Sequence, residues 1–121
     1  MKNNRLNKIS SDTNILSLDA LIIGAGFSGL YQLYSLKKLG LSAKVIEAGS
    51  GVGGTWYWNR YPGARCDSES FTYSYTFSKE LFKEWEWTER YPGYAEVIKY
   101  LNYVADKFCL KNDIYFEKKV I

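Results

Sequence analysis

The chain has 121 residues, of which 46% are hydrophobic and 17% aromatic, so it is long enough for one small folded domain and is not of disordered composition. Its net charge of +3 comes largely from three basic residues near the start, and no basic stripe or membrane-length apolar run follows, which argues against nucleic acid or a membrane span. Histidine is absent and the cysteines, Cys66 and Cys109, are isolated, which argues against zinc and favours a reducing, cytoplasmic location.

Residues 1–17 are rich in Asn and Ser and lack the apolar core of a signal peptide. We interpret them as a flexible polar tail. Because Lys2, Arg5 and Lys8 precede the first acidic residue, a transit peptide is the alternative. Residues 18–121 are then the folded part.

The first elements form a familiar pattern. Residues 18–23 are an apolar run typical of a buried parallel strand, residues 28–39 have the apolar spacing of a helix that Gly40 ends, and residues 43–47 predict a second strand. A strand, a tight turn, a helix and a second strand within this length are a βαβ unit. The fold class we predict is therefore α/β and Rossmann-like.

The second half is less regular. Glycines and Pro62 in residues 48–67 argue against any regular element there. Residues 71–77 alternate as a strand does, although an irregular segment lining a ligand would look the same. The remaining pattern predicts a helical turn at 79–85, a helix at 95–108 and a strand at 114–120. These are too few parallel strands for a doubly wound sheet, so we expect an incomplete sheet. We interpret the chain as the N-terminal part of a longer polypeptide and expect the remainder of that polypeptide to pack against it.

Gly24, Gly26 and Gly29 fit the pattern G-x-G-x-x-G between the first strand and the helix. The first glycine permits the tight turn, the second lets the backbone approach a pyrophosphate, and the third lets the helix pack close to the strand. The start of the helix then offers free N–H groups to the phosphates. A turn without a ligand is the alternative.

Glu47 ends the second strand, at the distance from the glycines that dinucleotide recognition requires. Its carboxylate can accept hydrogen bonds from ribose hydroxyls and would repel a 2′-phosphate, so this site should not prefer NADP. An ordinary exposed surface glutamate is the alternative.

Gly53 and Gly54, followed by Thr55 and Trp56, favour FAD over NAD. Extended FAD needs small residues beyond the ribose, and adjacent glycines permit such an approach. Trp56 could then form a wall beside the flavin. The alternative is a flexible surface hairpin with a buried tryptophan.

Together with Gly24–Gly29 and Glu47, the run GVGGTWYWNRYPGARCDSES at residues 51–70 resembles the N-terminal part of type I Baeyer–Villiger monooxygenases, which are class B flavoproteins. The resemblance covers residues 18–121. It implies the N-terminal part of the FAD-binding domain of a flavoprotein with two dinucleotide-binding domains. It further implies that FAD, NADPH and O2 are used to convert a ketone into an ester or lactone.

The resemblance also implies roles for individual residues. Arg65, Cys66 and Asp67 would lie toward the nicotinamide, and Asp67 would support a catalytic arginine that this sequence does not contain. The alternative for Asp67 is the N-cap of a helix beginning at residue 68. The positions implied or inferred to surround FAD are Gly24, Gly26, Phe27, Ser28, Gly29, Glu47, Gly53, Gly54, Thr55, Trp56, Asp67, Tyr73 and, through its backbone, Val120.

Two other functions remain open. One is a related class B flavin monooxygenase that oxidises nitrogen or sulfur. The other is a catalytically inactive FAD-binding fragment, since the arginine and the second glycine motif of the family would follow Ile121. We expect the isolated chain to be inactive in either case.

Overall fold

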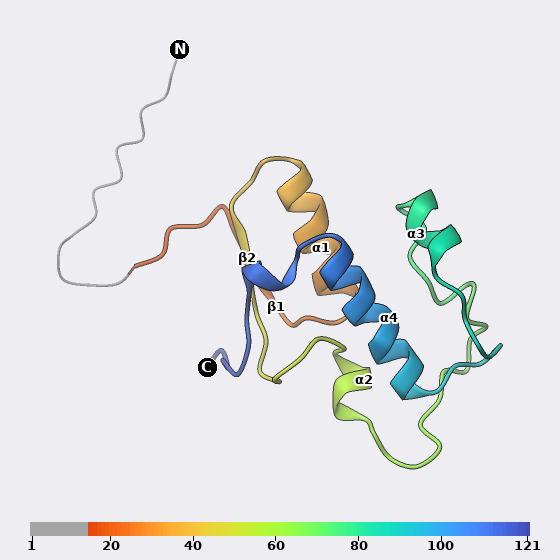
Figure 1. Cartoon of the computed structure of the whole chain (residues 1–121). Coiled ribbons are helices and arrows are strands. Elements are labelled where there is room, and N and C mark those ends of the chain that lie inside the picture. Colours follow the sequence, from red (N-terminus) through yellow and green to blue (C-terminus); the bar gives the residue numbers. More distant parts are fainter. Residues whose placement is uncertain (1–14) are drawn as a thin grey trace.

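The computed structural model describes residues 15–121 (Figure 1), so most of the tail predicted at residues 1–17 lies outside the described residues. The α/β prediction is confirmed by a parallel sheet of three strands in the order β1-β2-β3. The elements are β1 (Ala20–Ile23), α1 (Phe27–Lys38), β2 (Ala43–Ile46), α2 (Thr55–Trp58), α3 (Lys79–Glu84), α4 (Tyr94–Lys107), a short 3₁₀ helix η1 (Lys111–Asp113) and β3 (Ile114–Tyr115).

The two faces of the sheet differ in burial. Ile22, Val45 and Ile114 lie opposite one another across the three strands and are buried on one face. On the other face of β1, Leu21 and Ile23 are 52% and 69% exposed. Parallel sheets in α/β proteins are normally covered on both faces, so this apolar face has the character of a surface that packs against further structure.

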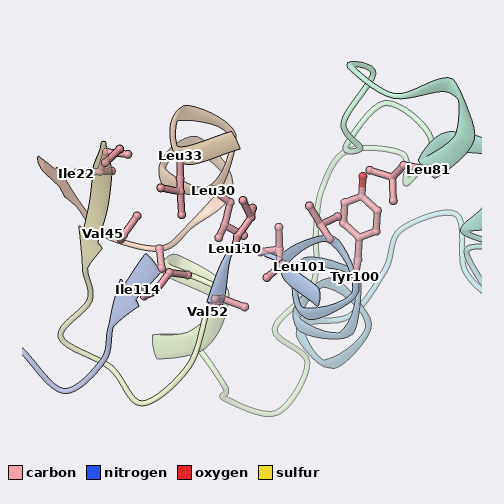
Figure 2. Close-up of a cluster of buried hydrophobic side chains, with 14 of the residues drawn as sticks. Ile22, Leu30, Leu33, Val45, Val52, Leu81, Tyr100, Leu101, Leu110 and Ile114 are labelled. Carbon is pink, nitrogen blue, oxygen red and sulfur yellow. The ribbon is translucent and has the colours of Figure 1, made fainter. Parts of the chain in front are cut away.

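The core extends from the sheet to the helices. Figure 2 shows Ile22, Leu30 and Val45 at one end of the buried cluster, with Leu101 and Leu81 toward the other. Leu101 lies on the apolar stripe of α4, as the sequence pattern predicted, and Leu81 lies on α3. The cluster therefore joins the βαβ unit to the second half of the chain.

An ion-pair network fastens the last strand to the first βαβ unit. Lys37 of α1 and Lys44 of β2 both contact the carboxylate of Asp113, which directly precedes β3. Burial alone would raise the pKa of Asp113, but the hydrogen bonds from Lys37 and Lys44 outweigh burial and hold it below its ordinary value.

This lowered pKa predicts an acid-dependent loss of stability. Because the folded-state pKa of Asp113 is depressed, its contribution is complete above the unfolded-state pKa of about 3.9 and is lost as pH falls through the folded-state pKa. Asp113→Asn should therefore flatten the fall in unfolding free energy on acidification. Urea titrations from neutral to acidic pH measure this, with Asp106→Asn, whose ion pair with Lys111 is more exposed, as the control. Parallel curves for Asp113→Asn and the unchanged protein would contradict the prediction.

The prediction of a strand at residues 71–77 is wrong, because the residues that the structure describes between α2 and α3 form no strand. The backbone N–H groups of Thr72 and Tyr73 donate back to the carbonyl of Glu69, at 3.0 Å each, and the N–H of Tyr75 donates to the Tyr100 hydroxyl at 2.9 Å. Local turns and a side chain thus satisfy the backbone without a neighbouring strand. Tyr73, Tyr75 and Phe77 are half-buried in this irregular segment, as in the irregular alternative, whereas Phe71 is exposed.

Two further predictions need correction. Residues 48–67 are not wholly irregular, because α2 forms one helical turn directly after Gly53 and Gly54, both of which have positive φ. The last strand ends at Tyr115 instead of residue 120. Glu117 has a φ of 57°, which breaks the extended backbone, and its N–H donates to the carbonyl of Gly49 beyond the end of β2.

Candidate functional site

The glycine turn connects β1 to α1. Gly24 has a φ of 98°, in the region that favours glycine, and its N–H donates to the carbonyl of Ile46 at 2.9 Å. A Cβ atom on Gly29 would lie 1.9 Å from the Gly24 carbonyl oxygen, so only glycine lets the helix pack this close to the turn. The geometry of these two positions is the one that the motif predicts.

The first turn of α1 can bind an anion. Gly26 is the N-cap, no side chain caps the helix, and no acidic residue lies in its first turn. The N–H groups at a helix start have no partner within the helix, and the helix dipole places partial positive charge there. Phosphate oxygens are suitable acceptors at such a position.

Glu47 lies at the carboxyl end of β2 and is only 4% exposed, so the alternative of an exposed surface glutamate is wrong. Its Oε2 accepts a hydrogen bond from the N–H of Ala25 at 2.6 Å, and its Oε1 accepts one from the N–H of Gly49 at 2.7 Å. The carboxylate therefore links the glycine turn to the loop after β2. Each oxygen of an ionised carboxylate retains a further acceptor site for a hydroxyl group.

The second glycine segment packs directly on the first. The N–H of Gly53 donates to the carbonyl of Ala25 at 3.0 Å. A Cβ on Gly54 would lie 2.9 Å from the Cα of Gly26, and a Cβ on Gly26 would lie 3.3 Å from the Cα of Gly54. This contact brings two predicted site segments together, with Gly26 and Gly54 half-buried and without side chains to obstruct a ligand.

An aromatic group adjoins these backbones. The indole N–H of Trp56 donates to the Tyr73 hydroxyl at 3.0 Å, and the Tyr73 ring packs edge-on against Phe27 at 4.9 Å between centroids. Phe27 and Ser28 also line a groove of about 540 Å³ beside α1, together with Tyr31, Ser74, Tyr75, Thr76 and Phe77. Residues 71–77 thus contribute to the site by packing against the start of α1.

Arg65, Cys66 and Asp67 lie in a separate segment held by residues 89–92. The Arg65 guanidinium pairs with Glu89 and also donates to the carbonyl of Tyr91, while the N–H of Cys66 donates to the carbonyl of Pro92 at 2.9 Å. Cys66 is buried and Asp67 is exposed. The N-cap alternative for Asp67 is wrong, because the first helix after Asp67 is α3, which begins at Lys79.

Three further predicted residues are Ser28 in the first turn of α1, Thr55 at the start of α2, and Val120 after β3. Ser28 accepts a hydrogen bond from Gln32, Thr55 accepts one from Asn59, and Val120 is 45% exposed. Sequence reasoning missed Tyr57, whose ring lies against Gly49 and Gly51 and whose backbone lies against Gly53. Three glycines at alternating positions shortly before an aromatic residue were the available signal.

The model of the family described as "NAD(P)-binding Rossmann-like domain" matches residues 22–85, which include both glycine segments and Glu47. The chain therefore belongs to this family. Within it, the chain is similar to the N-terminal part of Baeyer–Villiger monooxygenases, as the sequence resemblance indicated.

Several relatives are identical to this chain at about half of the aligned positions. An acetone monooxygenase (methyl acetate-forming) from Gordonia sp. (strain TY-5) is 51% identical over 86% of this chain. A phenazine N-monooxygenase from Lysobacter antibioticus is 48% identical over 85% of it. A Baeyer–Villiger monooxygenase from Pseudooceanicola batsensis is 47% identical over 84% of it.

The solved structure of the monooxygenase OTEMO in complex with FAD and NADP superimposes with a TM-score of 0.81, at 44% identity over 86% of this chain. The match covers 20% of that structure, and the chain likewise spans 20% of the acetone monooxygenase and 19% of each of the other two relatives. Within residues 15–121, no helix is both long and apolar enough to cross a membrane.

Proposed function

We propose that this chain is the FAD-binding portion of an NADPH-dependent flavin monooxygenase that inserts one oxygen atom of O2 beside a ketone carbonyl, giving an ester or lactone. The observation that carries the proposal is the contact of Gly26 with Gly54 beside the buried carboxylate of Glu47. Along extended FAD the adenosine ribose, the pyrophosphate and the ribityl-flavin follow one another in that order, and Glu47, the turn at Gly26 and Gly54 offer a contact for each. The resemblance to ketone-oxidising relatives supports the reaction.

Each segment has a distinct task in this proposal. The free N–H groups at the start of α1 bind the pyrophosphate, and Glu47 accepts hydrogen bonds from the ribose hydroxyls. Gly53 and Gly54 let the flavin chain pass, and Trp56 with Tyr73 shields one side of it. When FAD is bound and reduced by NADPH, it supplies the electrons that activate O2.

The segment Arg65–Asp67 is proposed to face the nicotinamide. Its attachment to residues 89–92 fixes the backbone while Asp67 stays exposed and able to pair with an arginine from elsewhere in the polypeptide. Ser28 and Thr55 would lie beside the FAD phosphates and ribityl chain, and Val120 beside the adenine. The protein is further proposed to act in the cytoplasm, which fits its two free thiols.

A second candidate function is oxidation of a heteroaromatic nitrogen, which the similarity to the phenazine N-monooxygenase favours. The test uses the product of the complete gene, purified and assayed with NADPH, O2 and either a cyclic ketone or a phenazine. Lactone formation with ketone-dependent NADPH oxidation is the expected result. N-oxide without lactone would favour the second candidate, and a protein that binds no FAD would contradict both.

The 121 residues alone are expected to form no ester under the same conditions, because residues 15–121 offer no arginine paired with Asp67. The purified chain, assayed beside the complete gene product, tests this. Ketone-dependent ester formation by the chain alone would contradict the expectation.

A further inference from the structure

The loop between β2 and α2 is shaped by one aromatic ring. A Cβ on Gly49 would lie 2.6 Å from Cε1 of Tyr57, and one on Gly51 would lie 3.5 Å from Cε2 of the same ring. A Cβ on Gly53 would lie 3.0 Å from the backbone nitrogen of Tyr57. The loop thus passes around this residue at three alternating positions, and Gly49 and Gly53 leave no room for a side chain.

The ring is fixed on its remaining sides. The Tyr57 hydroxyl accepts a hydrogen bond from the N–H of Ser50 at 3.0 Å and lies 2.7 Å from the Ser50 hydroxyl. These hydrogen bonds lower the pKa of Tyr57 below its ordinary value. The Arg60 guanidinium stacks over the ring at 4.6 Å from its centroid, and its Nε donates to the carbonyl of Tyr57 at 2.7 Å. The ring therefore has little freedom to move away from Gly49.

Gly49 connects this ring to the proposed ribose-binding carboxylate. Its N–H donates to Oε1 of Glu47, and its carbonyl accepts from the N–H of Glu117 at 3.0 Å. The other carboxylate oxygen accepts from Ala25 in the glycine turn. A displacement of Gly49 would consequently turn or release the carboxylate that links the two halves of the site.

We propose that Tyr57 is a positioning residue for the dinucleotide, holding Gly49 so that the Glu47 carboxylate faces the ribose and Gly53 stays against the glycine turn. The proposal rests on the proposed FAD site and adds a residue that does not itself need to touch FAD. It predicts that substitutions at Gly49 and at Tyr57 do not act independently on FAD affinity, because the side chain at position 57 fills the space beside Gly49.

The test is a double-mutant cycle in the complete gene product, with Gly49→Ala, Tyr57→Leu and the two combined. FAD affinity is measured by titrating the deflavinated proteins, beside their melting temperatures and flavin absorption spectra. Each single substitution is expected to weaken FAD binding about tenfold. The combined variant should bind no more weakly than Gly49→Ala alone, because leucine leaves room for the added methyl group.

Two variants separate positioning from general packing. Tyr57→Phe keeps the ring and should retain FAD affinity within about threefold, because only the two hydrogen bonds between the hydroxyl and exposed Ser50 are lost. Tyr61→Leu replaces a 62% exposed aromatic shortly after α2 and should leave affinity unchanged.

If the loss of FAD affinity in the combined variant equalled the product of the losses in the two single variants, the proposal would be overturned. Normal FAD affinity in Gly49→Ala would overturn it as well. If Tyr57→Leu does not fold, Gly49→Ala and Tyr57→Phe still decide: weak binding in the first with normal binding in the second supports it, and any other pair of results overturns it. Absence of FAD binding in the unchanged protein would instead contradict the proposed function.

Discussion

Gly29→Ala is expected to destabilise the fold by at least about 3 kcal/mol and to abolish FAD binding. The added methyl group would lie 1.9 Å from the carbonyl oxygen of Gly24 and 3.0 Å from its carbon. Both obstacles are backbone atoms of the tight turn, so the clash is relieved only by moving the start of α1 away from β1. That movement also removes the helix N–H groups from the phosphate position. Chemical denaturation and FAD titration measure the two effects.

Gly40→Ala is the matched control. Gly40 has a positive φ, of 77°, which Gly29 in α1 does not have, but a Cβ there would meet nothing within 4 Å. The cost should be only the backbone strain of about 1 kcal/mol, with FAD affinity unchanged. Equal losses for the two variants would show that the close approach of Gly29 to Gly24 has no special importance.

Glu47→Gln should produce the second large effect, a loss of about 2 kcal/mol of stability together with weakened FAD binding. The carboxylate accepts hydrogen bonds from two backbone N–H groups, those of Ala25 and Gly49. A glutamine side chain has one oxygen and one NH2 group, so it faces one of these donors with another donor. A buried N–H would then lose its partner in the middle of the proposed site.

Urea denaturation and FAD titration again measure both quantities. Glu80→Gln, at a glutamate whose side chain is 74% exposed, is the control and should change neither. If Glu47→Gln were as stable as this control and bound FAD normally, Glu47 would have no role in either the fold or the ribose site.

The βαβ unit was predictable because short-range patterns determine it. An apolar run before Gly24, helical spacing after Gly26 and an acid at the end of the next strand together predict a strand, a helix and a strand at this spacing. The sequence left open whether Glu47 is exposed, and the structure buries it against Ala25. The glycine segments and the family resemblance predicted the βαβ unit that the structure contains.

The segments beyond Glu47 were harder because tertiary contacts determine them. Residues 71–77 alternate in residue type like a strand, yet their backbone bonds to Glu69 and to the Tyr100 hydroxyl, and no local pattern reveals a partner as far along the chain as Tyr100. The role of Tyr57 was hidden for a similar reason. In the sequence, the glycines of residues 48–67 argue against a regular element, and Gly53 and Gly54 permit the approach of FAD, whereas in the structure Gly49 and Gly51 accommodate a ring.

The contact between Gly26 and Gly54 restricts which sequences this fold can accept. The two positions are separated along the chain by α1 and β2, yet a Cβ on Gly54 would lie 2.9 Å from the Cα of Gly26, and one on Gly26 would lie 3.3 Å from the Cα of Gly54. A side chain at Gly54 therefore forces one backbone to shift, and a side chain at Gly26 requires Gly54 to give way by a few tenths of an ångström. Random mutagenesis at both positions, selected for FAD retention, should return glycine at both and no pair of larger residues.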